Sequence, residues 1–199
     1  NSFSASLPTK IIREKVSKVS SYRKSLNQMG LVLGEEDIIK GLQFNSGVQG
    51  GNPGSSNIHV RGSSHYQNQL LLDGIPIFNI NHLNGATSPL PSQGINQAML
   101  YKQEVPVEYN GGSGSVVNLL PDKGLIQNVT GSIAAGLGTF SGNVFFPIGK
   151  DNTTIRISSR ASTLGPVTYF NQLFSPDQSN ALGFEDVLMS LESKIDSAN

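Results

Sequence analysis

Three histidines, His59, His65 and His82, have the most versatile side-chain chemistry in this sequence. Their spacing is not typical of metal ligands, and the chain has no cysteine that could complete a zinc site. Serine is too frequent for one residue to be singled out as a nucleophile, and no serine has the surroundings of a nucleophile elbow. The sequence therefore predicts no metal site and no cofactor, and it does not favour an enzyme.

Two features argue against phosphate and nucleic acid as ligands. The glycine-rich stretch with Gly111, Gly112 and Gly114 resembles a phosphate-binding loop only superficially, because no Lys-Ser or Lys-Thr follows and the next element is a predicted strand. The formal net charge is zero and only 14% of the residues are charged, whereas nucleic-acid binding requires a basic face.

Apolar spacing and turn signals predict a small mixed α+β domain in the middle of the chain. Residues 35–44 have the periodicity of a short helix, and Glu36 and Asp37 are interpreted as residues of its first turn rather than as an acid–base pair. Pro76 should lie in an edge strand because it cannot donate to a ladder. Strands are predicted at 58–61, 69–72, 75–78, 95–101 and 115–120, with a hairpin turn at Asp73-Gly74.

After Gly124 the sequence changes to strict alternation of apolar and polar residues. Ile155 and Ile157 fall on one face of a predicted strand, and Arg156 and Arg160 fall on the other. Strands of about ten residues with this period are typical of a transmembrane β-barrel, with the apolar face toward lipid and the polar face toward the lumen. A soluble sandwich of half-buried strands gives the same alternation and is the alternative interpretation.

The length of this second part limits the number of strands. Residues 125–199 can supply only three to five strands, which are too few to close a barrel. An open set of strands in lipid would leave backbone groups unpaired. A partial chain or a partly resolved one is therefore favoured over a subunit completed by another polypeptide. The sequence has no apolar run near 18 residues for a transmembrane helix. Its start lacks a basic n-region and an apolar h-region, so any signal peptide is expected to be already removed or not included.

Five landmarks occur in a fixed order between residues 35 and 119. They are the helix at 35–42, the Gly47-Val48 turn, Val60-Arg61-Gly62, the run from Leu71 to Pro76, and Tyr109 followed by a glycine-rich hairpin into 116–119. In this order and spacing they resemble the plug domain of TonB-dependent outer-membrane receptors, especially those of the Bacteroidota. The resemblance implies a periplasmic lead-in at 1–28, a plug domain at 29–123 and the first strands of an outer-membrane β-barrel at 124–199.

The resemblance also implies roles for particular residues. Arg61 and Lys102 are expected to form a lock between the plug and acidic groups of the barrel wall, although Arg61 could instead be an ordinary surface strand residue. The plug motif comprises Gly62, Asp73, Gly74, Pro76, Tyr109, Gly111 and Gly112. A loop with Asn79, Asn81, His82 and Asn84 could face the ligand, although a solvated loop histidine explains His82 at least as well.

The function implied by the family is gated, energised uptake of a nutrient such as a siderophore, glycan or peptide across the bacterial outer membrane. The expected partners are outer-membrane lipid, the rest of the barrel, TonB, and a surface lipoprotein or other envelope subunits, with no nucleic acid. Two departures favour the alternative of a structural or binding subunit without transport. Gln103 and Glu104 follow Lys102 where the family has glycines, and Ser113 stands where it has a basic residue. Residues 1–7 contain no convincing TonB box.

Overall fold

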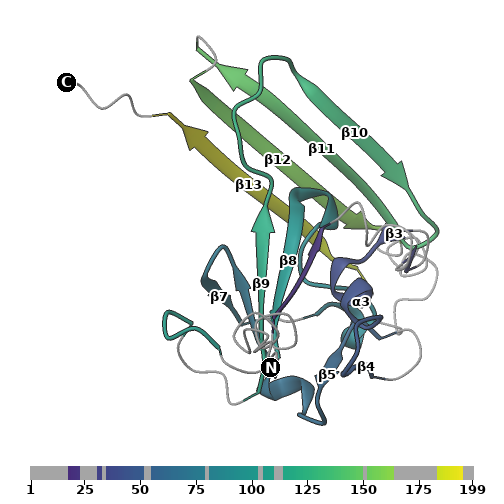
Figure 1. Ribbon diagram of the computed structural model, residues 1–199. Coiled ribbons are helices and arrows are strands. Elements are labelled where there is room, and N and C mark those ends of the chain that lie inside the picture. Colours follow the sequence, from purple (N-terminus) through teal and green to yellow (C-terminus); the bar gives the residue numbers. More distant parts are fainter. Residues whose placement is uncertain are drawn as a thin grey trace, which may run out of the picture.

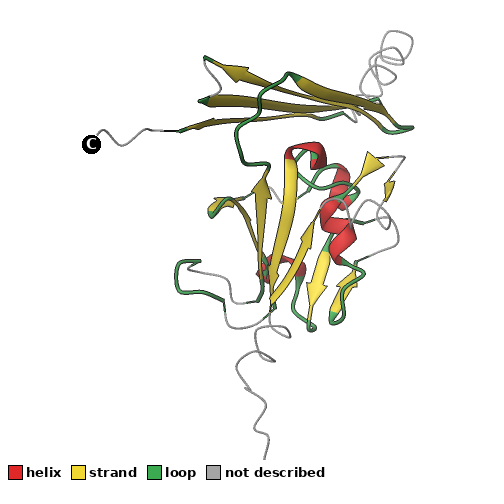
Figure 2. Cartoon of the chain, turned by 45° about the horizontal axis from the view of Figure 1, so that its top comes forward, coloured by secondary structure: helices red, strands yellow, loops and turns green. Residues whose placement is uncertain are grey.

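Two β-sheets organise the chain, one in each half of the sequence (Figure 1). The computed structural model describes residues 18–22, 31–32, 35–51, 55–78, 81–102, 105–109, 114–149, 152–163 and 183–194. The first domain contains the strands up to residue 121. The second sheet comprises the four strands that follow and lies as a separate layer across one end of the first domain (Figure 2).

The first domain is built on a five-stranded mixed sheet. Its strand order is β1-β8-β9-β6-β7, with β6 and β9 parallel and the other neighbours antiparallel. The strands are β1 (Lys18–Tyr22), β6 (Gln69–Leu72), β7 (Ile75–Ile77), β8 (Ile95–Tyr101) and β9 (Val116–Pro121). Two short ladders add β2 (Leu31–Val32) with β3 (Glu35–Glu36), and β4 (Val48–Gly50) with β5 (Ile58–Val60). The predicted mixed α+β domain is confirmed.

The helix α3 (Ile38–Leu42) is shorter than predicted and covers one face of this sheet. Asp37 has an extended backbone and its side chain caps the helix, so the helix begins at Ile38. Glu36 was expected in the first helical turn, but it pairs with Leu31 in a strand. Ile38, Ile39 and Leu42 are buried against apolar residues of β5, β6, β8 and β9, which form the core.

Three short 3-10 helices interrupt the connections: η1 (His65–Gln67), η2 (Leu83–Gly85) and η3 (Ser92–Gly94). Helix η2 begins in the loop that was predicted to face the ligand, and η3 directly precedes β8. The Asp73-Gly74 hairpin is confirmed, with positive φ angles of 48° and 85° at its two central residues. Pro76 lies in β7 at the edge of the sheet, as expected.

The second sheet is an antiparallel meander in the order β10-β11-β12-β13. Its strands are β10 (Thr130–Ala135), β11 (Thr139–Ile148), β12 (Thr153–Ser162) and β13 (Glu185–Ser193). In β12 every second residue is buried: Thr154, Arg156, Ser158, Arg160 and Ser162. This polar face is covered by the first domain, whereas Ile155 and Ile157 face away from it, so the predicted alternation is confirmed.

Candidate functional site: the contact between the two sheets

Arg160 of β12 joins the second sheet to the first domain. Its guanidinium donates two hydrogen bonds to Asp186 Oδ2 on the neighbouring strand, at 2.6 and 3.1 Å. The Nη2 atom, which makes the 2.6 Å bond to Asp186, also donates to the Ser88 carbonyl oxygen of the first domain at 2.7 Å. The side chains of Arg160 and Asp186 are only 1% and 9% exposed, so water competes weakly for these charged groups. We call this arrangement of Arg160 and Asp186 on Ser88 the Ser88 clasp.

His82 and Phe184 complete the surroundings of the Ser88 clasp. His82 Nε2 lies 2.7 Å from Asp186 Oδ1, and it donates that hydrogen bond because an ionised carboxylate can only accept. The imidazole stacks on the Phe184 ring with centroids 4.7 Å apart and an interplanar angle of 10°. The Arg160 guanidinium lies 4.9 Å from the centroid of the same ring. Both oxygens of Asp186 are therefore occupied.

The backbone of Ser88 is held by its N–H group as well as by its carbonyl oxygen. Its N–H donates to Asp37 Oδ2 at 2.8 Å, and Asp37 Oδ1 accepts from the N–H groups of Ile39 and Lys40 in the first turn of α3. The Ser56 hydroxyl donates to Asp37 Oδ2 at 2.7 Å. One buried carboxylate therefore connects the helix to the segment that Arg160 holds.

A second arginine of β12 binds the segment that links the two sheets. Arg156 pairs with Glu192 of β13 at 3.2 Å and donates to the Gly124 carbonyl oxygen. Glu192 accepts from the Gly124 N–H at 2.6 Å, so this ion pair binds both polar groups of one glycine. Glu192 is 37% exposed, so the Arg156–Glu192 pair is more accessible to solvent than the Arg160–Asp186 pair. We call it the Gly124 clasp.

Close packing at η3 fills the space beside the Ser88 clasp. A Cβ atom on Gly94 would lie 2.8 Å from a Leu188 methyl group and 2.9 Å from the Ser158 hydroxyl, so only glycine fits without movement. The Gln93 amide donates to the Ser141 hydroxyl of β11 at 3.0 Å. The first domain therefore contacts three strands of the second sheet directly.

The outer face of the second sheet is apolar and uncovered. Ile133 is 79% exposed and Leu137 is 88% exposed. Other exposed apolar side chains of this sheet and its flanks are Val129, Phe140, Val144, Ile148, Val187, Met189 and Leu191. An apolar face of this extent on one side of a sheet, with arginines and serines on the other, fits hydrocarbon outside and a polar interior.

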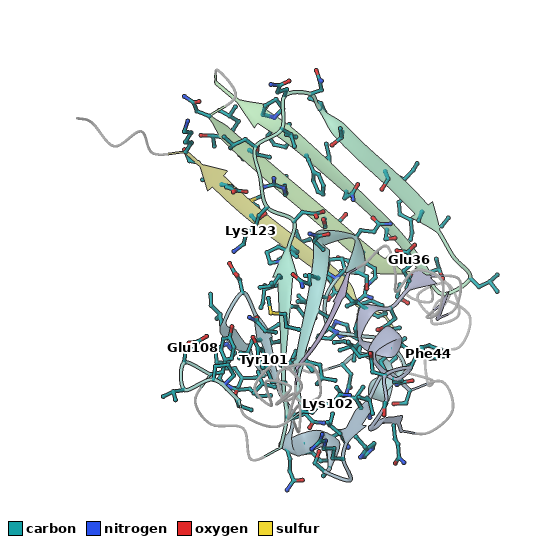
Figure 3. All side chains as sticks on the ribbon, in the orientation of Figure 1. Glu36, Phe44, Tyr101, Lys102, Glu108 and Lys123 are labelled. Carbon is teal, nitrogen blue, oxygen red and sulfur yellow. The ribbon has the colours of Figure 1, made fainter. Side chains whose placement is uncertain are left out.

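The two residues predicted to form the lock lie together but away from the second sheet. Lys102 is buried, its amino group donates to the Ser46 carbonyl oxygen, and Figure 3 shows it at a part of the first domain remote from β10–β13. Burial, and then the nearby charge of Arg61, lower the pKa of Lys102 below its usual value. Arg61 was expected in a strand, but it lies in a turn with φ 51° and is exposed. Within the described residues it forms no ion pair.

The predicted plug-motif residues act as turn and packing groups. Asn118 lies in the middle of buried β9, and its side chain accepts from the Gly74 N–H at 3.0 Å and donates to the Tyr109 hydroxyl at 3.1 Å. Burial raises the pKa of Tyr109. Asp73 pairs with Lys123 at 3.0 Å on the surface. Gly62 has φ 81°, a conformation that favours glycine. Gly111 and Gly112 lie outside the described residues.

The loop predicted to face the ligand is only partly described. Asn81 donates to the Asn57 side chain at 3.0 Å, and His82 binds Asp186 as given above. Asn79 and the side chain of Asn84 lie outside the described residues. The contact of His82 with β13 was not foreseen, and neither were the roles of Ser88, Phe184 and Asp186. The sequence signal for this contact was the pair of arginines on the polar face of β12.

Within the described residues, no cluster of three or more histidine and carboxylate side chains could hold a metal ion. None of the helices in this part of the chain is long and apolar enough to cross a membrane.

A small α+β domain held against the polar face of an antiparallel sheet, whose other face is apolar, is the arrangement of a plug inside a β-barrel. Residues 19–117 match the family model described as the TonB-dependent receptor plug domain. The chain therefore carries a plug domain of the TonB-dependent receptor family, followed by antiparallel strands like those of the receptors' barrels. This is a family of receptors and transporters rather than an enzyme class. The first domain is called the plug below.

Solved structures support this fold. The siderophore receptor PirA of Pseudomonas aeruginosa aligns with 91% of this chain and 31% of its own, at a TM-score of 0.61 and 15% identity. A mutant of the ferric enterobactin receptor of the same organism aligns over 73% and 24%, at 0.55 and 17% identity. The ferric yersiniabactin uptake receptor of Yersinia pestis aligns over 73% and 24%, at 0.51 and 16% identity. The chain thus spans 24–31% of the length of these receptors. A comparison with curated proteins gives no sequence match.

Proposed function

We propose that the whole protein is a TonB-dependent outer-membrane transporter of the Bacteroidota type that gates energised uptake of a nutrient, such as a siderophore, a glycan or a peptide. One observation carries the proposal: the plug is seated on the polar face of a sheet whose opposite face is apolar and uncovered. A soluble sandwich would cover that apolar face with a second layer.

The lengths of the strand connections give the sheet a direction in the membrane. At one end of the sheet four residues join β11 to β12, whereas at the other end three residues join β10 to β11 and 22 residues, 163–184, join β12 to β13. Outer-membrane barrels have short periplasmic turns and longer extracellular loops. We therefore expect the end of the sheet where β12 ends and β13 begins, which carries the Ser88 clasp, to face the cell exterior. The Gly124 clasp then lies toward the periplasm.

The expected partners are outer-membrane lipid around the apolar face, the rest of the barrel around the plug, TonB on the periplasmic side, and a surface lipoprotein on the outer side. The lock formed by Arg61 and Lys102 with acidic wall residues remains part of this proposal. Its acidic partners would belong to strands other than β10–β13, because Lys102, which feels the nearby charge of Arg61, lies far from that sheet (Figure 3). The loop with Asn81 and His82 would lie near the ligand.

Two experiments on the full-length protein test this function. Deleting the plug, residues 19–121, from a receptor that still inserts should open the barrel, which outer-membrane sensitivity to a large antibiotic such as vancomycin would report. Growth on ferric siderophores as the sole iron source, on oligosaccharides as the sole carbon source or on peptides as the sole nitrogen source should require the receptor and an intact TonB system. A structural subunit without transport, the alternative function, would insert and copurify with envelope proteins while growth on all three classes stayed unchanged.

A further inference from the structure

The two clasps share one design. In each, an arginine of β12 pairs with a carboxylate of β13 and donates to a backbone carbonyl of the plug or its linker. Arg156 and Arg160 are four residues apart, so their side chains leave the same face of the strand toward different parts of the plug. The sheet therefore holds the plug at two separate backbone positions.

The two positions differ in what lies behind them. Behind Gly124 the chain continues directly into the barrel, and the Ile126 N–H binds the Thr154 hydroxyl of β12 at 3.0 Å. Behind Ser88 lies the carboxylate of Asp37, which caps α3. The Ile38 N–H also donates to the Ser92 hydroxyl at 3.2 Å. The start of α3 is therefore fixed by the segment that the Ser88 clasp holds.

We propose that the Ser88 clasp is a coupling device: it transmits displacement of the outer end of β13 through the Ser88 peptide to α3, independently of the Gly124 clasp. Asp186 and Arg160 are the positioning residues of this device. The inference rests on the proposed function only in taking the second sheet as barrel wall. Release of the Ser88 clasp loosens residues 81–91 and the start of α3, while η3 stays packed on the second sheet and the linker stays bound at Gly124.

Charge and burial make the Ser88 clasp the stronger of the two contacts. The Ser88 N–H and carbonyl belong to strong hydrogen bonds with charged groups on opposite sides, Asp37 and Arg160. Asp186→Asn leaves Arg160 buried beside a neutral partner, and its one amide oxygen can replace only one of the two oxygens that accept from Arg160 and His82. Gly124 is held by the carboxylate of Glu192, which is 37% exposed. Water can therefore replace the hydrogen bonds of the Gly124 clasp more easily when this carboxylate is removed.

Hydrogen exchange of the full-length receptor, folded in detergent, tests the coupling with two matched isosteric variants. Asp186→Asn breaks the Ser88 clasp and Glu192→Gln breaks the Gly124 clasp. Asp186→Asn should accelerate exchange at the N–H groups of Ile39, Lys40 and Ser88 by about tenfold, equivalent to about 1.4 kcal/mol. It should leave Gly124 and Ile126 within about twofold of the wild type. Glu192→Gln should give the reverse pattern.

Equal acceleration of both segments by either variant would overturn the proposal, because the interface would then open as one unit. Acceleration at Ser88 without any change at Ile39 and Lys40 would overturn the coupling to α3. Arg160→Lys, which keeps the charge but loses the planar fork, should reproduce the Asp186→Asn pattern more weakly and serves if that variant does not insert. Exchange is measured without any nutrient, so a failure of the proposed transport would appear separately, as absent uptake with an unchanged exchange pattern.

Discussion

The backbone N–H of Ser88 donates a 2.8 Å hydrogen bond to the carboxylate of Asp37, 51 positions earlier in the chain. Asp37 is almost fully buried and accepts four hydrogen bonds from the residues that the structure describes. Asp37→Ala should therefore destabilise the plug by about 3 kcal/mol, from the lost cap and the buried donors left unpaired. Urea unfolding of the plug in the full-length receptor, followed by pulse proteolysis, measures this loss.

Asp37→Asn separates the two contributions. The amide oxygen can still cap α3, whereas the amide nitrogen cannot accept from Ser88, so a smaller loss of about 1–2 kcal/mol is expected. Glu108→Gln, at an exposed position, is the control and should leave the urea midpoint unchanged. Equal losses for both Asp37 variants would show that the lost acceptor for Ser88 and Ser56, rather than the cap, accounts for the effect.

The Asp73-Gly74 turn should respond differently at its two positions. Gly74 has φ 85°, so Gly74→Ala should cost about 1–2 kcal/mol of plug stability. Asp73→Asn should be nearly neutral, because asparagine tolerates positive φ and the surface ion pair with Lys123 contributes little. The same urea midpoints check both variants, and a larger loss for Asp73→Asn would contradict this account of the turn.

Local rules predicted the elements whose causes are local. The hairpin at Asp73 follows from turn chemistry, and the alternation of Arg156 and Ile157 follows from the period of a strand. The start of α3 was placed too early because the capping role of Asp37 was read as a first-turn role. Arg61 was assigned to a strand because its positive φ is not encoded by its residue type.

The contact between the plug and the second sheet could not be predicted, because its partners are far apart in the sequence. Ser88 and Arg160 are 72 positions apart, and His82 and Asp186 are 104 positions apart. Periodicity showed which face of β12 is polar, but not which backbone group that face would meet. The buried Asn118 likewise interrupts an apolar strand for a reason that appears only when Gly74 and Tyr109 are placed beside it.

Membrane insertion should depend on which face of β10 carries a charge. Ile133 points outward and Ser132 points to the inner face, where it binds Asn143. Ile133→Arg should cost about 2–4 kcal/mol in the bilayer and lower the amount of inserted receptor. Ser132→Arg, one residue away on the polar face, is the matched control and should insert normally. Heat-modifiable migration of outer-membrane fractions measures insertion, and equal insertion of both variants would refute the lipid-facing assignment.

The lowered pKa of Lys102 predicts a pH dependence of plug stability. Between the lowered pKa and the usual lysine pKa of 10.5, the unfolded chain binds more protons than the folded one, so stability should rise with pH across this window. The raised pKa of Tyr109 acts in the opposite direction above pH 10, so the slope is best measured below that value. Lys102→Met should remove the rise in urea midpoint, and an unchanged slope in that variant would assign the effect to another group.

Arg61 provides the test of the proposed lock. It is exposed at a turn with φ 51°, and none of the described residues forms an ion pair with it, as expected if its acidic partners lie on other barrel strands. In the assembled barrel, Arg61→Ala should leave those carboxylates without a partner, at a cost of about 3–5 kcal/mol if the pair is buried. The plug should loosen, and passive permeability to small solutes should rise in liposome swelling assays.

Arg61→Lys is the matched comparison for this lock, because it keeps the charge but cannot bind a carboxylate with a planar fork. It should give an intermediate permeability, with both variants inserted to the level of the wild type. Permeability equal to that of the wild type in an inserted, full-length Arg61→Ala receptor would mean that Arg61 is an ordinary turn residue. The plug would then be retained by contacts such as the two β12 arginines rather than by the lock.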